Sequence, residues 1–281
     1  MPILSDNPLL KREIRGRIRF RKFGANRMNL WVSGFVALVV LYFYGRALAA
    51  IGKGQAADAR DFWAALVYGL LFLIVLLAPS LTANAVTQER EQQTWDTLAT
   101  TRLTAGEVLL GKWLARQVPL MLVLVVALPL LLGCAVRGQI HPITTVLALL
   151  FLILTSGLFG VIGLLCSFLA KRTALATASA LTLTAFLCLG TLIVDSLYRS
   201  LITLISHSSY GEPTILLWCN PFFALSCLLR LIEPTHNEIF ATGDHAPLSQ
   251  VALFYFVGGS AAILGCLSLM IVRYRRAVQE R

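Results

Sequence analysis

Residues 62–112 read FWAALVYGLLFLIVLLAPSLTANAV and then TQEREQQTWDTLATTRLTAGEVLLGK, so that an apolar run changes at Thr87 into a polar segment. The apolar part is long enough to cross the hydrocarbon core of a bilayer as a helix, which takes roughly 20 residues. The polar part, residues 87–112, is typical of a loop in water. The boundary therefore predicts a transmembrane helix followed by a loop at the membrane surface.

Similar apolar runs occur along the whole chain of 281 residues, of which 57% are hydrophobic and only 14% charged. Ordinary soluble domains contain roughly 25% charged residues. We therefore predict an all-α membrane protein with one transmembrane domain over residues 1–281. Its six predicted transmembrane helices are 29–51, 62–86, 113–133, 143–169, 174–195 and 250–272.

The net charge of +10 could indicate a nucleic-acid partner, but the positions of the basic residues favour a different interpretation. If the chain starts in the cytoplasm and crosses six times, most of the 24 Lys and Arg residues fall in cytoplasmic segments. This bias follows the positive-inside rule. We predict cytoplasmic N- and C-termini and no nucleic-acid partner. The basic residues left on the outer side would be Arg46, Lys53, Arg60, Arg137, Arg199 and Arg230.

The first 28 residues predict an amphipathic helix on the cytoplasmic membrane surface. An Asn-Pro pair at residues 7–8 is typical of a helix start. Aliphatic residues then recur every four positions, and basic residues occupy the other faces, which suits a helix lying among lipid headgroups. A solvated basic tail is the alternative. The interfacial residues would be Leu10, Ile14, Arg15, Ile18 and Arg19.

Between the fifth and sixth spans, residues 198–248 would form an extracytoplasmic segment. Its apolar stretch 214–232 is broken by Asn220-Pro221. A seventh span here would move the basic C-terminal end to the outside, against the charge bias. We therefore predict an outer hairpin of two short helices, re-entrant or interfacial. Asp195 is expected to end the fifth span near Arg199 or water.

Within the fourth span, Gly157, Gly160 and Gly163 are spaced three apart. Small residues at this spacing allow two helices to approach closely. We interpret this stripe as a packing surface.

The polar loop contains one pattern that resembles a phosphate-binding site and that we reject. Gly106 to Lys112 fits GxxxxGK, but the next residue is Trp113, which has no hydroxyl for magnesium. Thr104 and Glu107 also form a capping box, which predicts a helix from Thr104 or Ala105.

The chain has no HExxH or GxSxG motif, and its Cys and His residues lack metal-ligand spacing. We predict no catalytic, cofactor or metal site in this chain.

Trp95 and Leu98, beside the charged residues 89–91, indicate a short surface helix with one apolar edge. That edge could lie on the membrane or insert into a groove on a partner protein.

The sequence AVTQEREQQTWDTL at residues 85–98, followed by TRLT at 101–104 and Gly111-Lys112, resembles the type-2 ABC exporter permease family. Members of this family, the transmembrane subunits of ATP-binding cassette transporters, carry an (I/V)xxERExGTxExL motif after the second span and a TxP…GK motif beyond it. Gln93 replaces the usual glycine and Leu103 the common proline. The resemblance covers most of the chain.

The resemblance implies a bacterial inner-membrane or plasma-membrane permease that pairs with a second permease subunit, the same or related. Two separate ABC-type ATPase subunits, which bind ATP and Mg, would dock on its cytoplasmic face. A further contact would come from the N-terminal interfacial helix. The implied coupling residues are Glu89, Arg90, Glu91, Thr94, Trp95, Asp96 and Leu98, with a smaller contact at Lys171, Arg172 and Thr173.

Three functions remain at this point. The first is the membrane subunit of an ATP-driven exporter, with an apolar or amphipathic substrate because the spans contain few charges. The second is an ion-coupled secondary transporter, which would be expected to place ionisable residues near mid-bilayer, where this chain has few. The third is a membrane anchor or sensor that recruits a soluble partner.

Overall fold

The computed structural model describes residue 45 and residues 56–92, 105–206, 214–232 and 248–279. Within these ranges every regular element is a helix. The elements are α3 (Ala56–Thr82), α4 (Thr87–Glu91), α6 (Ala105–Arg137), α7 (Pro142–Leu169), α8 (Thr173–Ala185), the π-helix η1 (Phe186–Gly190), α9 (Thr191–Ser206), the 3-10 helix η2 (Ile215–Cys219), α10 (Pro221–Ile232) and α11 (Leu248–Gln279).

Five helical segments in the described part of the chain are long and apolar enough to cross a membrane, and they correspond to the second to sixth predicted spans. Apart from Gly45, the predicted first span (29–51) lies outside the described residues, as does the predicted interfacial helix in 1–28. The count of six spans therefore stays a prediction. The five segments are Ala56–Glu91, Gly106–Arg137, Pro142–Leu169, Thr173–Ile205 and Leu248–Arg273.

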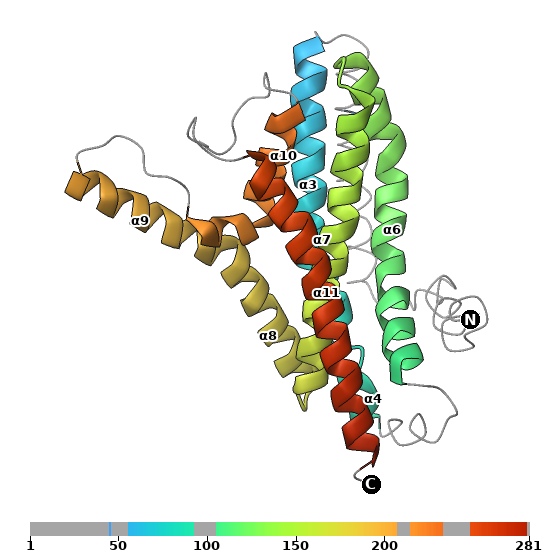
Figure 1. The fold of residues 1–281 in the computed structure, drawn as a ribbon. Coiled ribbons are helices and arrows are strands. Elements are labelled where there is room, and N and C mark those ends of the chain that lie inside the picture. The colour runs from blue at the N-terminus through green and yellow to red at the C-terminus, as the bar shows by residue number, and fades with distance from the viewer. Residues whose placement is uncertain (1–44, 46–55, 93–104, 207–213, 233–247, 280–281) are drawn as a thin grey trace, which may run out of the picture.

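Helices α3, α6 and α7 run side by side, and α11 packs along α7 (Figure 1). Their shared core includes Trp63 of α3, together with Phe151 and Leu152 of α7, all fully buried. The end of α3, α4, the starts of α6 and α8, and the end of α11 all lie at one end of the bundle (Figure 1). This end is the one that the charge distribution predicts to be cytoplasmic.

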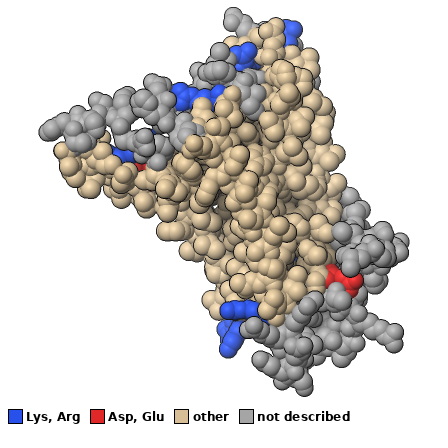
Figure 2. All heavy atoms as spheres, in the orientation of Figure 1, with Lys and Arg blue, Asp and Glu red and all other residues tan. Residues whose placement is uncertain are grey.

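The surface also suits a membrane. Figure 2 shows Lys and Arg side chains toward the ends of the face in view, while side chains without charge cover its middle. Large aliphatic residues are exposed on these helices, including Val125 on α6 and Leu150 on α7. Lipid is a suitable solvent for such a surface, whereas water is not.

The three glycines of α7 lie at helix contacts, as the packing interpretation predicted. A Cβ atom at Gly163 would lie 2.6 Å from the carbonyl oxygen of Pro79 in α3. One at Gly160 would lie 1.9 Å from the Gln117 side-chain nitrogen of α6. Two neighbouring helices therefore approach the same face of α7, and close van der Waals packing replaces the hydrophobic driving force that lipid does not provide.

The fifth span does not end at Asp195, and that prediction was wrong. The helix continues through α9 to Ser206, after a π-helical segment at Phe186–Gly190. At this segment the chain changes direction, and α9 extends away from the bundle (Figure 1). Asp195 remains helical because its carboxylate has partners, which are described below.

Residues 214–232 form two short helices, η2 and α10, separated at Asn220 as predicted. With 12 residues, α10 is too short to cross a bilayer. It packs against α11 and α7. Whether this hairpin is re-entrant or interfacial stays a prediction.

Candidate functional site

Helix α4 forms at the bundle end, directly after a break in the second span. Helix α3 ends at Thr82, residues 83–86 form turns, and α4 begins at Thr87. Pro79 lies inside α3, three residues before its end, and removes one helical hydrogen bond there. The hydroxyl of Thr82 donates a hydrogen bond to the carbonyl oxygen of Ala78 at 2.8 Å. In transmembrane helices that contain proline, such hydroxyl groups help to satisfy backbone carbonyl groups.

The start of α4 is capped by a residue of another helix. The hydroxyl oxygen of Ser167 in α7 accepts hydrogen bonds from the backbone N–H groups of Val86, at 2.9 Å, and Thr87, at 3.2 Å. Val86 provides no cap of its own. Because the first N–H groups of a helix have no partner within it, Ser167 supplies what the local sequence lacks. Helix α4 is thereby fixed to α7.

Glu89 joins α4 to α6. Its carboxylate forms an ion pair with the ammonium group of Lys112. The Lys112 side chain is only 1% exposed and that of Glu89 only 19%. Removing one partner of a buried ion pair is destabilising, because it takes a counter-charge away from the group that remains. Glu89 was predicted to contact a partner protein, but most of its side chain is buried inside this chain.

Arg90 joins α4 to the end of α7. Its guanidinium group donates to the carbonyl oxygen of Ala170 at 3.1 Å and lies 5.6 Å from the centre of the Phe168 ring. Ala170 is the C-cap of α7, where the helix dipole places partial negative charge. The arginine therefore combines a charge-assisted hydrogen bond with a cation–π contact.

Glu91 joins α4 to α8. This contact connects the two segments predicted to couple to an ATPase, residues 89–98 and residues 171–173. Its carboxylate accepts hydrogen bonds from the backbone N–H of Thr173, at 2.8 Å, and from the Thr173 hydroxyl, at 3.1 Å. Arg172, at the N-cap of α8, makes no side-chain capping bond. A carboxylate at a helix N-terminus is also favoured by the helix dipole. Glu91 therefore caps α8 from outside it.

The surface over this contact is open and polar. Gln88, Glu91 and Gln92 on α4 are exposed, as are Lys171 and Arg172 in the turn before α8. A pocket of about 520 Å³ opens between the two helices. It is lined by Asn84, Gln88, Glu91, Gln92, Thr173, Ala174 and Thr177. We call these exposed residues and the pocket the α4–α8 surface.

Several predicted coupling residues cannot be placed. Thr94, Trp95, Asp96 and Leu98 lie outside the described residues, as do Leu10, Ile14, Arg15, Ile18 and Arg19 of the predicted interfacial helix. Lys171, Arg172 and Thr173 lie next to α4, as the prediction of two docking elements on one face requires.

Three residues that fix the site were not predicted as site residues. Lys112 belongs to the Gly-Lys pair of the family motif, so the sequence did contain a signal for this residue. It lies in the segment 106–113, which is part of α6, as the capping argument predicted. Arg116 donates to the Asn84 side-chain oxygen at 2.6 Å and to the Leu81 carbonyl oxygen at 3.1 Å, which supports the turn before α4. Ser167, the third, carries no sequence signal because its role depends on the position of α4.

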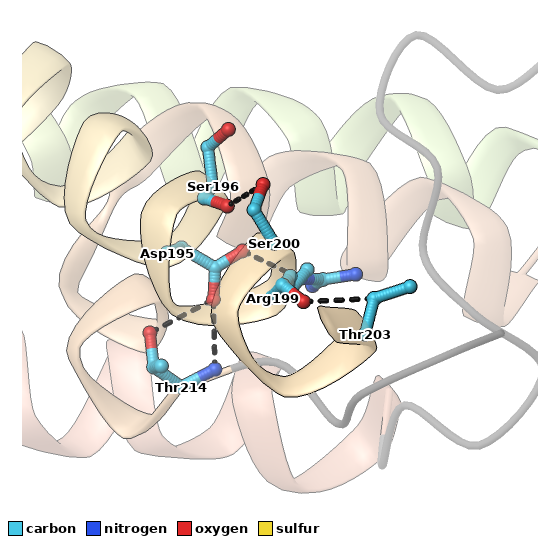
Figure 3. A network of polar contacts seen from close by, with 6 residues as sticks. All are labelled: Asp195, Ser196, Arg199, Ser200, Thr203 and Thr214. Atoms are coloured by element: carbon cyan, nitrogen blue, oxygen red, sulfur yellow. Dashed lines mark hydrogen bonds and ion pairs between the residues drawn. The ribbon is translucent and has the colours of Figure 1, made fainter. Parts of the chain in front are cut away.

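A second polar network connects α9 to the residue before η2 (Figure 3). Asp195 on α9 forms an ion pair with Arg199 at 2.7 Å. Its other oxygen accepts hydrogen bonds from the backbone N–H and the hydroxyl of Thr214, both at 2.9 Å. The partnership with Arg199 was predicted, while the bond to Thr214 was not. Asp195 thus connects α9 to the start of the hairpin formed by η2 and α10.

Asn220 makes a further link between the hairpin and the fifth span. Its amide nitrogen donates to the carbonyl oxygen of Cys188, at 2.7 Å, and to the Thr191 hydroxyl, at 2.8 Å. Its side-chain oxygen accepts from the backbone N–H of Phe222 at 2.9 Å and caps α10. Cys188 lies within the π-helix, whose wider turn alters the ordinary helical bonding. Asn220 therefore holds α10 against this segment.

Within the described ranges, no three His, Cys, Asp or Glu side chains lie close enough together to hold a metal ion. The α4–α8 surface carries hydrogen-bonding groups and charges of both signs. This chemistry suits contact with another protein.

Comparison with known proteins identifies a family for this chain. Residues 46–272 match the family model described as ABC-2 family transporter protein. No curated protein matches the sequence.

Proposed function

The chain belongs to the ABC-2 family of transporter proteins, and from that premise we propose that separate ATPase subunits drive it by docking on the α4–α8 surface. The family and the five apolar helices make it a multi-pass membrane subunit of an ABC transporter. The proposal concerns how this subunit receives work from its ATPase partners.

The observation that carries the proposal is the position and connection of α4. The helix lies at the bundle end, and each residue of its Glu89-Arg90-Glu91 run contacts a different part of the bundle. Glu89 pairs with α6, Arg90 binds the end of α7, and Glu91 caps α8. A displacement applied to α4 is therefore passed to three spans at once.

Such connections suit a rigid-body mechanism. Packed helices move between discrete arrangements and are not continuously deformed, so a push at one rigid contact shifts whole spans. In this proposal the exposed residues Gln88, Gln92 and Arg172 touch the ATPase, whereas Glu89 and Arg90 transmit the force inward. The sequence-based hypothesis assigned docking to all of Glu89, Arg90 and Glu91, whereas this proposal gives docking to the exposed residues and force transmission to Glu89 and Arg90.

The remaining parts of the proposal follow from the family resemblance and the charge distribution. We propose an exporter that works with two ATPase subunits and a second permease subunit, in a bacterial inner or plasma membrane, with both termini in the cytoplasm. ATP and Mg bind to the ATPase partners. An apolar or amphipathic cargo fits the scarcity of charge among the described spans.

The test blocks the surface without removing any of the contacts that hold it. Gln92→Trp places a bulky side chain on the exposed end of α4. Asp61→Trp makes the same kind of change on an exposed residue of α3 near the opposite end of the bundle. Both variants are purified and mixed with the ABC-type ATPase encoded beside this chain. We expect Gln92→Trp to lose ATPase binding and its effect on ATP turnover, and Asp61→Trp to retain both.

Equal binding by the two variants would refute docking at this surface. Ser179→Ala adds a structural control on α8, because it removes a hydrogen bond within that helix and lies outside the lining of the α4–α8 pocket. We expect this variant to bind the ATPase normally.

A further inference from the structure

A groove of about 360 Å³ lies on α11, near the outer hairpin and far from the α4–α8 surface. Its walls come from η2 and the first three turns of α11. They are formed by Trp218, Ser249, Gln250, Leu253, Phe254, Val257 and Gly258. We call it the α11 groove. The transport proposal above does not use it.

The groove is polar at one end and apolar along the rest of its length. Ser249 and Gln250 lie at the start of α11, and both are exposed. Leu253 and Val257, one and two turns further, expose 66% and 60% of their surface. A ligand that fits both ends therefore has a polar head and an aliphatic tail.

The length of the groove matches one leaflet of a bilayer. From Ser249 to Gly258 the helix rises about 14 Å, at ~1.5 Å per residue. Half of a hydrocarbon core of ~30 Å is about 15 Å. Because α11 starts in the part of the bundle that lies away from the predicted cytoplasmic end, this leaflet is the outer one (Figure 1).

Gly258 creates the space at the deep end. A Cβ atom built there would meet no other atom within 4 Å, so the missing side chain leaves the groove open. A larger residue at this position would fill the groove without a steric clash at its Cβ atom.

Trp218 supplies an aromatic side chain in the wall. Its ring packs edge-on against Phe254, with 5.7 Å between ring centres. This aromatic pair forms a rigid apolar wall on the side of η2, while the indole nitrogen itself is buried within the protein.

We propose that the α11 groove binds one acyl chain of a phospholipid of the outer leaflet. The chain lies along Leu253, Val257 and the open position at Gly258. The headgroup and ester region lie beside Ser249 and Gln250. The bound lipid bridges η2 and α11, and thereby holds the outer hairpin against the last span.

The test uses a phosphatidylethanolamine probe with a diazirine in the middle of one acyl chain. The full-length protein is placed in nanodiscs that contain the probe, irradiated, and mapped by peptide mass spectrometry. We expect labelling at Leu253 and Val257 to be several-fold stronger than at Val125 and Val126 of α6. Those two residues expose similar fractions of their surface and report ordinary surrounding lipid.

Two matched variants of α11 make the result specific. Gly258→Leu fills the groove, whereas Gly265→Leu adds the same side chain on the same helix at a position whose added Cβ also meets nothing within 4 Å. Both changes replace glycine by a better helix former, so neither should hinder folding. We expect Gly258→Leu to lower groove labelling about tenfold, equivalent to roughly 1.4 kcal/mol of binding free energy, and Gly265→Leu to leave it unchanged.

Uniform labelling of α6 and α11, or full labelling in Gly258→Leu, would overturn the proposal. Disulfide-linked dimers of Leu253→Cys in membranes would also overturn it, because a second copy of the chain would then occupy the groove.

Discussion

Loss of the Lys112 ammonium group tests how far the buried ion pair holds α4 in place. Lys112→Met keeps much of the side-chain volume but removes the ammonium group that pairs with the Glu89 carboxylate, which is 19% exposed. Breaking a buried ion pair on one side costs about 3–5 kcal/mol. Because Glu89 is reached by some solvent, we expect a loss of about 3 kcal/mol in the free energy of unfolding.

The double variant Glu89→Leu, Lys112→Met distinguishes the pair from general packing. Replacing both charges by apolar groups of similar size is often neutral or stabilising. We therefore expect the double variant to be clearly more stable than Lys112→Met alone. This non-additivity is expected for residues in direct contact.

The assay is unfolding of the purified protein in detergent, followed through the denaturant or thermal midpoint. Lys171→Met is the control, because Lys171 is an exposed lysine at the same end of the bundle and isolated surface charges contribute roughly 0–1 kcal/mol. Unchanged stability in Lys112→Met, or additive losses in the double variant, would refute the reasoning.

Three further variants test other contacts, each by the unfolding midpoint in detergent. Ser167→Ala leaves two backbone N–H groups without their shared acceptor and should lower the free energy of unfolding by about 1–3 kcal/mol. The control Ser179→Ala removes a bond within its own helix and should have little effect. Equal effects of the two variants would contradict the capping role of Ser167. Gly160→Ala should destabilise the protein because the added Cβ collides with the Gln117 side chain of α6. The control Gly69→Ala meets open space and should be neutral or stabilising. If Gly160→Ala is as stable as the original protein, the close α6–α7 contact is wrong. Asn220→Ala removes a helix cap and two further hydrogen bonds and should cost about 2 kcal/mol or more, so a neutral result would show that α10 does not depend on this residue.

The long helices could be predicted from sequence because their apolar runs leave few alternatives. Helix α7 begins one residue before its predicted start and ends at the predicted Leu169. In lipid every backbone polar group must be satisfied within the segment, so an apolar run of this length forms a helix. The start of α6 at Ala105 likewise agrees with its local capping signal.

The end of the fifth span could not be predicted because it depends on contacts distant in sequence. An aspartate after an apolar run ordinarily indicates an end at the membrane surface. Here Thr214 and Arg199 satisfy the Asp195 carboxylate, so the helix continues. The position of Thr214 is set by the folded hairpin and has no local signal.

The assignment of the Glu89-Arg90-Glu91 run and the turn at 171–173 as coupling residues stays a prediction. The motif does not distinguish exposed residues from those whose partners lie within the protein. Glu89 and Arg90 are charged and therefore resemble docking residues, but their partners, Lys112 and Ala170, come from helices that follow later in the chain.

If the ATPase acts on this chain through α4, exposed residues of α4 lie against the ATPase in the assembled transporter. A photoreactive amino acid is placed at Gln88 or, as the control, at Asp61, and cells that express this chain together with the ATPase are irradiated. We expect a covalent adduct between the ATPase and the chain labelled at residue 88, and none with the chain labelled at residue 61. An adduct at residue 61 alone, or labelling of residue 88 by reagents confined to the outside of the cell, would contradict this expectation.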